Sequence, residues 1–296
     1  MTARAYAKIN LGLRILRKRE DGYHDIETVL RRIDLFDEIS FEPASTISLA
    51  CNRHDLPSDD RNLCVRTAGL LQKMFGLHKG VHMTLKKNIP IGAGLGGGSA
   101  DGAVVVRTLP QWWGVRLDRQ EMLDLARELG ADVPYFLKPG TAYATGKGEV
   151  LEYFQLDLPY WIVVVYPNLR ISTAWAYQHI QIKYQQSKFN NSRITTPTPR
   201  SQASLKNILL EYIDEPRMLM NLVHNDFEPL ILRTHEPVAR VKQALYVGGA
   251  EFAQMSGSGS SVYGLFEKEG YAKDAARELA NNFEISITPP HFIPET

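Results

Sequence analysis

The sequence predicts an α+β protein built of two lobes. Strand-like and helix-like segments alternate in a mixed order along 296 residues, and no internal repeat is visible. The chain is about twice as long as a typical domain, so each half can bury a core of its own. The break is expected between residues 155 and 156, which gives an N-terminal lobe at 1–155 and a C-terminal lobe at 156–296.

Charge and cysteine content exclude several classes of protein. Lys and Arg number 34 against 33 Asp and Glu, and no basic block is present, so the electrostatic signature of a nucleic-acid binder is missing. The two cysteines, Cys51 and Cys64, lack the spacing of metal ligands and fit a reducing compartment. The longest apolar run, residues 161–166, is too short to span a bilayer. The N-terminus lacks the apolar core of a signal peptide, so a soluble cytoplasmic protein is expected.

The first elements follow from hydrophobic periodicity. Residues 6–16 and 37–50 alternate in the manner of strands. A helix is expected after residue 61, with Asn62 near its start. Residues 81–87 alternate again and predict a half-buried strand that runs directly into a glycine-rich stretch, Pro90 to Gly102.

A helix is expected after the glycine stretch. Ser99 is predicted as its N-cap, and Asp101 suits its first turn. Pro110 is expected to end or kink it. The next helix is marked by a capping-box pair, Asp118 and Glu121.

The helix that begins near Asp118 is expected to end at Gly130, and the remaining elements are expected to follow it to the end of the chain. Predicted are a helix stop at Gly130, strands at 141–153 and 160–167, helices at 221–235, 238–249 and 271–283, and strands at 252–255 and 262–266. Residues 185–204 are polar and aperiodic, which predicts a long loop that either covers a ligand or hangs free.

The glycine stretch admits several interpretations. A strand, a glycine loop and a helix together present backbone N–H groups to an anion. Gly92, Gly94 and Gly97 satisfy the dinucleotide-binding pattern, but the second strand that this pattern requires does not follow. Gly98 stands where a Walker A loop has its lysine. Tight strand-to-helix packing alone would need only one or two glycines.

A different kinase loop matches better. "PIGAGLGGGSA" at 90–100 and "MSGSGSSVYGLF" at 255–266 resemble two motifs of the superfamily of galactokinase, homoserine kinase, mevalonate kinase and phosphomevalonate kinase (GHMP kinases). Five further motifs narrow the resemblance to its 4-diphosphocytidyl-2-C-methyl-D-erythritol kinase branch. They are "AKINLGLRI" at 7–15, "DGYHDIETV" at 21–29, "NL" at 62–63, "GADVPYF" at 130–136 and "TGKGE" at 145–149. The resemblance spans about residues 5–283, apart from the polar insertion.

The resemblance implies a fold and a reaction. The N-terminal lobe should be similar to the second domain of ribosomal protein S5, and the C-terminal lobe to a ferredoxin-like fold. ATP should donate its γ-phosphoryl group to the 2-hydroxyl of a cytidylated methylerythritol, a small-molecule substrate of non-mevalonate isoprenoid synthesis. Magnesium is expected with ATP, but no carboxylate in the sequence is identified as its ligand.

Two residues match the catalytic pair of the family, Lys8 and Asp132. An ammonium near a carboxylate favours the ionised acid and stabilises developing negative charge, as phosphoryl transfer requires. Each residue also has an ordinary interpretation. Asp132 follows a helix-stopping glycine and could cap the next helix, and Lys8 could be a solvated strand lysine.

The resemblance also assigns nucleotide-binding residues. The phosphates should be held by the backbone of Pro90, Ile91, Gly92, Ala93, Gly94, Leu95, Gly96, Gly97, Gly98, Ser99 and Ala100, with the Ser99 hydroxyl assisting. Asn62 and Leu63 match a stretch that lies against adenine. Their alternative role is the plain start of a helix, with Asn62 as its cap.

The cytosine base of such a substrate needs aromatic side chains to stack on its faces and a hydrogen-bonding side chain at its edge. Tyr23 offers a stacking face, and a neutral His24 can donate at one ring nitrogen and accept at the other. By resemblance Tyr177 closes the aromatic sandwich, with Trp175 as the competing candidate and Thr173 nearby. Without the other motifs, 22–24 would be an ordinary turn.

The acceptor should also meet residues from both ends of the chain. Asn10 lies two residues from Lys8, so both should face one side of a strand. Gly257 and Ser258 belong to a second glycine loop that by resemblance lines the acceptor site, or is simply a hairpin turn. Two rival functions remain at this point: a related kinase for simpler alcohols, and a nucleotide-binding sensor.

Overall fold

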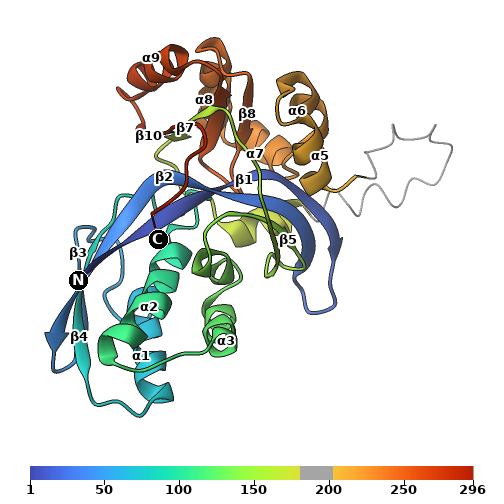
Figure 1. Ribbon diagram of the computed structural model, residues 1–296. Coiled ribbons are helices and arrows are strands. Elements are labelled where there is room, and N and C mark those ends of the chain that lie inside the picture. The colour runs from blue at the N-terminus through green and yellow to red at the C-terminus, as the bar shows by residue number, and fades with distance from the viewer. Residues whose placement is uncertain (181–202, 296) are drawn as a thin grey trace.

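Two separate sheets form the framework of the molecule. The computed structural model describes residues 1–180 and 203–295. Its larger sheet has six strands in the order β3-β4-β2-β5-β6, with β1 also paired to β2, and its smaller sheet has the order β10-β7-β9-β8 (Figure 1). Helices occur together with a mixed larger sheet and an antiparallel smaller sheet, which confirms the predicted α+β class.

The larger sheet is dominated by two long strands. Its members are β1 (Thr2–Lys18), β2 (His24–Ala44), β3 (Ile47–Cys51), β4 (Gly80–Lys86), β5 (Thr141–Thr145) and β6 (Val150–Phe154). β1 and β2 pair antiparallel over nearly their whole length, and irregularities in their register bend the ribbon. Every residue from Ala5 to Leu13 is buried, because both faces of this ribbon are covered.

Helices pack on one side of the larger sheet. They are α1 (Leu63–Met74), α2 (Gly97–Trp113), α3 (Arg119–Leu129) and the short 3₁₀ helix η1 (Val133–Leu137). Figure 1 shows α1, α2 and α3 side by side below β1 and β2. α2 is the central helix of this layer, since most of its residues are buried against the sheet and its neighbours.

The smaller sheet belongs to the C-terminal half. It contains β7 (Trp161–Tyr166), β8 (Phe252–Met255), β9 (Val262–Phe266) and β10 (Glu284–Thr288), accompanied by α5 (Leu205–Tyr212), α6 (Pro216–Leu222), α7 (Glu228–Thr234), α8 (Glu236–Val247) and α9 (Glu269–Leu279). Figure 1 shows α8 and α9 at the far end from α1. We propose the lobe boundary at 155/156, since β6 ends at Phe154 and β7 begins at Trp161.

Several local predictions are confirmed. The Asn62 side chain accepts from the Cys64 N–H and caps α1. Asp118 and Glu121 form the predicted capping box of α3, and Gly130 follows its last residue. These features need only neighbouring residues, which explains why they can be predicted locally.

Three predictions about α2 are wrong. Asp101 does not lie in its first turn, which contains no acidic residue. Ser99 is not its N-cap, because α2 already begins at Gly97 with Gly96 in the left-handed region before it. Pro110 does not end the helix, which continues to Trp113 and stops at Gly114. The buried apolar side chains of this last turn keep it helical despite the hydrogen bond that proline removes.

Other boundaries differ from prediction in the C-terminal half. The predicted helix 221–235 is interrupted, since α6 ends at Leu222 and α7 begins at Glu228. The last helix runs over Glu269–Leu279 rather than 271–283, and Phe283 lies beyond it. The predicted loop at 185–204 lies outside the described residues, apart from Ala203 and Ser204 at its end. No helix in the described ranges is long and apolar enough to cross a membrane.

Candidate active site

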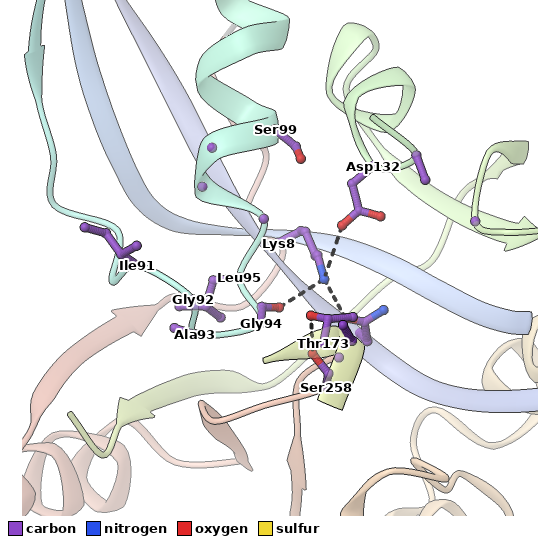
Figure 2. A pocket seen from close by; sticks show the side chains of 18 of the residues that line it. Lys8, Ile91, Gly92, Ala93, Gly94, Leu95, Ser99, Asp132, Thr173 and Ser258 are labelled. Atoms are coloured by element: carbon purple, nitrogen blue, oxygen red, sulfur yellow. Dashed lines mark hydrogen bonds and ion pairs between the residues drawn. The ribbon is translucent and has the colours of Figure 1, made fainter. Parts of the chain in front are cut away.

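A large cavity lies where the two halves meet. Its volume is about 810 Å³. β1, the loop before α2, the segment before η1 and the loop between β8 and β9 all contribute to its wall (Figure 2). Sequence-predicted residues on the wall are Lys8, Asn10, Tyr23, His24, Asn62, Leu63, Pro90, Ile91, Gly92, Ala93, Gly94, Leu95, Gly96, Gly97, Gly98, Ser99, Asp132, Thr173, Tyr177, Gly257 and Ser258.

The loop before α2 requires glycine at alternate positions. Gly92, Gly94 and Gly96 have φ angles of 68°, 78° and 71°, a region that other residues rarely adopt. A Cβ atom at Gly96 would lie 2.9 Å from the Phe136 ring, so space is lacking as well. α2 starts directly after this loop, and its first N–H groups have no acceptor within the helix. The loop and the helix start therefore present N–H groups of the kind that can bind an anion.

The two glycine loops of the chain are interlocked. A Cβ atom at Gly94 would lie 2.2 Å from the Ser256 carbonyl oxygen, so the backbones touch. The Ser261 N–H donates to the Ala93 carbonyl at 3.1 Å, and Ser256 Oγ donates to the Gly94 carbonyl at 3.0 Å. The second loop joins the antiparallel strands β8 and β9, so the hairpin interpretation holds while the loop also lines the cavity.

Lys8 brings a buried ammonium group to the floor of the cavity. Only 4% of the residue is exposed. Its Nζ donates to Asn10 Oδ1 at 2.6 Å and to the Gly94 carbonyl at 3.0 Å. Burial lowers the pKa of Lys8, and the nearby Asp132 carboxylate opposes this in part. The alternative of a solvated strand lysine is therefore wrong.

Asp132 faces Lys8 from the segment before η1. Its Oδ2 lies 3.9 Å from Lys8 Nζ, and 42% of its side chain is exposed. Figure 2 shows this carboxylate and the Ser99 side chain on the same side of the cavity as the ammonium. Asp132 occupies the N-cap position of η1, but its side chain makes no capping hydrogen bond. The carboxylate is therefore close to a cation and still open to a ligand.

Asn62 and Leu63, which were predicted to lie against adenine, both start α1 and line the cavity. Asn62 caps α1 and also donates from Nδ2 to the Pro57 carbonyl, while its neighbour Leu63 begins the helix. Both residues line the cavity on the α1 side of the glycine loop. The helix start therefore also forms part of the cavity wall.

An aromatic group closes the other end of the cavity. The His24 and Tyr177 rings stack at 4.8 Å between centroids, with 18° between their planes, and Phe227 supports Tyr177 edge-on. Tyr23 is largely exposed, with the Lys147 ammonium 4.7 Å from its ring centroid. Burial, and then Lys18, lower the pKa of His24, which favours the neutral ring near pH 7.

Tyr177 and Trp175, the two candidates for the second aromatic face, differ in position. Tyr177 is on the cavity wall, whereas Trp175 stacks on His179 and is not among the lining residues. Thr173 and Ser258 meet at the wall, with their hydroxyl oxygens 2.9 Å apart. The two hydroxyls join the segment before Tyr177 to the second glycine loop.

Asn10 faces the same side of β1 as Lys8, as predicted. Its Oδ1 accepts from Lys8, and its Nδ2 donates to Thr28 Oγ1 at 2.9 Å. Both ends of the Asn10 side chain thus have partners within the protein. Its clearest role in the structure is to hold the Lys8 ammonium in place.

Comparisons with known proteins agree with this geometry. Residues 62–140 match the family described as GHMP kinases N terminal domain, and residues 205–285 match GHMP kinases C terminal. Over 293 residues the chain is 41% identical to a 4-diphosphocytidyl-2-C-methyl-D-erythritol kinase of Chlorobium phaeobacteroides strain BS1, which covers 99% of this chain and 98% of the relative. The enzyme of that name from Chlorobium phaeovibrioides is 44% identical over 294 residues, or 99% of this chain and 97% of the relative.

The chain belongs to the 4-diphosphocytidyl-2-C-methyl-D-erythritol kinase family. A crystal structure of 4-(cytidine 5'-diphospho)-2C-methyl-D-erythritol kinase is 33% identical, with a TM-score of 0.78 and coverage of 97% of this chain and 98% of that one. A homoserine kinase from Cytophaga hutchinsonii has a TM-score of 0.64 at 16% identity, which shows likeness of fold alone. The predicted two-lobed GHMP kinase fold is confirmed.

Sequence reasoning missed several wall residues of this family member. Lys147 lies within the quoted "TGKGE" motif, yet no role was predicted for its side chain. Ser256 is not on the wall itself, but its buried hydroxyl supports the wall by donating to the Gly94 carbonyl, a contact that its motif did not predict. Lys87 and Asp101 are on the wall too, and their sequence positions gave no signal of it.

Proposed function

We propose that this protein transfers the γ-phosphoryl group of ATP to the 2-hydroxyl of 4-diphosphocytidyl-2-C-methyl-D-erythritol. The observation that carries the proposal is the placement of Asp132 beside Lys8 and the glycine cradle in one cavity. The family membership supports the same reaction. The protein would work in the cytoplasm on a small-molecule substrate of non-mevalonate isoprenoid synthesis, as its lack of a basic block and its two free cysteines suggest.

Each residue has a distinct task in this mechanism. Backbone N–H groups from Gly92 to Ser99 bind the phosphate oxygens at the positive end of α2. Ala100 takes no part, because it is not on the cavity wall and its N–H donates to the Gly96 carbonyl at 2.9 Å. The Asp132 carboxylate accepts the proton of the attacking hydroxyl. The Lys8 ammonium, held by Asn10 and Gly94, stabilises the charge that develops on the transferring group.

Magnesium would accompany ATP as the nucleotide's counter-ion. The described residues contain no cluster of three or more His, Cys, Asp or Glu side chains that could hold a metal ion by itself. Mg²⁺ is commonly bound through phosphates and water with one or two protein oxygens, so this wall is compatible with it. The ion would neutralise phosphate charge during transfer.

Recognition of the cytidine follows from the aromatic end of the cavity. Tyr23 offers an exposed ring face, the stacked pair of His24 and Tyr177 offers a second aromatic surface, and a neutral His24 offers one donor and one acceptor nitrogen. Lys147, above the Tyr23 ring, adds a cation next to the base site. A simple alcohol would use none of these groups.

The direct test is ATP consumption with a panel of alcohols. The cytidylated methylerythritol, homoserine and mevalonate are compared, each with the wild type and with Asp132→Asn. We expect turnover only with the cytidylated substrate and a loss of roughly 10³-fold in kcat for the variant, since it lacks the base. Turnover of a simple alcohol alone, or an undiminished rate in Asp132→Asn, would overturn the proposal.

Tyr23→Ala tests the specificity separately. Removing the stacking face should raise KM for the cytidylated substrate by about tenfold, because base stacking contributes about 1–3 kcal/mol. KM for ATP should stay unchanged. An exposed tyrosine on another surface, Tyr271, provides the matched control. Equal KM values in Tyr23→Ala and Tyr271→Ala would show that the base does not stack there.

A further inference from the structure

A buried ionic cluster lies beside the nucleotide end of the cavity, apart from Lys8 and Asp132. Its members are Lys87 just after β4, Asp37 in β2 and Asp101 in α2, none of them more than 6% exposed. Lys87 Nζ donates to Asp101 Oδ2 at 2.6 Å and also to Asp37 Oδ2. One ammonium thus links three elements of the N-terminal lobe.

Asp37 fixes more than the lysine. Its second oxygen, Oδ1, accepts the backbone N–H groups of Asn88 at 2.6 Å and Ile89 at 2.8 Å. These two residues lead directly into Pro90 and the glycine loop. The same carboxylate therefore orients both the Lys87 side chain and the backbone that enters the loop.

The other end of the loop rests on the same cluster. A Cβ atom at Gly97 would lie 2.9 Å from Lys87 Nζ and 2.9 Å from Ile89 Cγ2, so the first residue of α2 packs against the lysine head. Asp101 ties the next turn of α2 to that head. Both ends of the loop are thus held by one cation.

We propose that Lys87 is a positioning residue of the ATP site, and that with Asp37 and Asp101 it sets the spacing between the loop entrance and the start of α2. The inference rests on the proposed function, which makes that loop the phosphate cradle. Lys87 acts through the backbone. The N–H groups converge on an anion only when both ends of the loop are fixed.

The cluster also has an unbalanced charge. Asp101 Oδ1 has no hydrogen-bond partner among the described residues. Burial and the Asp37 charge raise the pKa of Asp101 to about 8, with Lys87 opposing them. Cys64 of α1 also faces the cluster, and burial raises the pKa of its thiol well above the ordinary value, so it stays neutral.

The net charge of the cluster changes with pH, and a purely structural role of Lys87 would not make ATP binding depend on that charge. Below about pH 8 one carboxyl proton makes the cluster neutral; above it, the cluster carries one net negative charge on the wall of the cavity. That charge repels the polyphosphate, so KM for ATP should rise above pH 8.

The first experiment compares Lys87→Met with Lys86→Met. Lys86 is the preceding residue, but its Nζ pairs with Glu38 at 3.0 Å and is exposed. Lys87→Met should raise KM for ATP about tenfold or more and leave kcat at saturating ATP and KM for the acceptor nearly unchanged, because only the cradle is misplaced. Lys86→Met should match the wild type. Equal KM values for ATP in the two variants would overturn the inference.

Asp101→Asn keeps the inference testable where Lys87→Met fails to fold. The amide has the shape of the carboxyl group and still offers Lys87 an acceptor, but it does not titrate. The rise in KM for ATP above pH 8 should disappear in this variant. An unchanged rise from pH 7 to 9.5 would contradict the inference.

Calorimetric titration with a non-hydrolysable ATP analogue separates the two proposals. If no alcohol is phosphorylated but the analogue's affinity falls in Lys87→Met and not in Lys86→Met, the proposed function fails and the positioning role stands. If the cytidylated substrate is phosphorylated and both variants bind the analogue as the wild type does, the positioning role fails alone.

Discussion

Lys8 and Lys87 line the same cavity, and both are almost fully buried. Their surroundings differ. Lys87 is clamped by two carboxylates at hydrogen-bond distance, whereas Lys8 has an amide, a carbonyl and one carboxylate 3.9 Å away. The pKa of Lys87 is accordingly raised, since its two carboxylates outweigh burial, and that of Lys8 is lowered by burial. Lys87, which is paired with two acidic side chains, holds the structure of the site. Lys8 has only one carboxylate, 3.9 Å away, so its ammonium can still interact with a substrate.

The largest expected effect tests this division in catalysis. Lys8→Met should lower kcat by roughly 10³-fold, because it removes charge stabilisation where phosphoryl transfer needs it. Lys87→Met should leave kcat at saturating ATP within about threefold of the wild type. Steady-state rates at saturating ATP and acceptor measure both. Comparable losses in the two variants would erase the distinction.

The second effect concerns the free energy of unfolding, for which Lys87→Met should lose more than Lys8→Met. Lys87→Met leaves the buried Asp37 carboxylate and the buried Asp101 carboxyl group without their cation and should cost about 3 kcal/mol or more. Lys8→Met should change stability by less than about 1 kcal/mol, since burial already disfavours this charge. Urea unfolding at pH 7 gives both values. A Lys8→Met variant that loses as much as Lys87→Met would show that Lys8 is structural.

The smallest effect is the pH dependence of stability. The pKa of Lys8 is lower in the folded state than in the unfolded state, so as pH rises the folded chain loses this proton before the unfolded chain does. The cost of burying the charged ammonium therefore falls as pH rises toward the ordinary pKa of lysine. The wild type should therefore gain stability relative to Lys8→Met between pH 8 and 10, by less than Lys87→Met loses. Paired urea titrations at the two pH values measure the change. A constant difference between the chains would mean that the folded state does not alter this lysine.

Local sequence predicted the features that depend on neighbouring residues. Asn62 as a cap, the capping box of Asp118 and Glu121, and the glycine loop after a strand could all be read from spacing. Ser99 is not the N-cap, because close contacts of Gly96 with Phe136 and Lys8 fix the start of α2 further back. Pro110 does not end the helix, because the last turn is buried as far as Trp113. Local preferences of about 1–3 kcal/mol are smaller than the energy of burying such a helix.

By itself, the sequence determined the two-lobed α+β class, the glycine-rich loop between a strand and a helix and, through its motifs, the kinase family. Only the tertiary structure decided that Lys87 is paired with two acidic side chains while Lys8 is not. It also decided that Tyr177 rather than Trp175 lies on the cavity wall, and that the two glycine loops touch. The reason is distance along the chain. Lys8 and Asp132, or Gly94 and Ser256, are more than a hundred residues apart, and their contacts exist only after both lobes have packed.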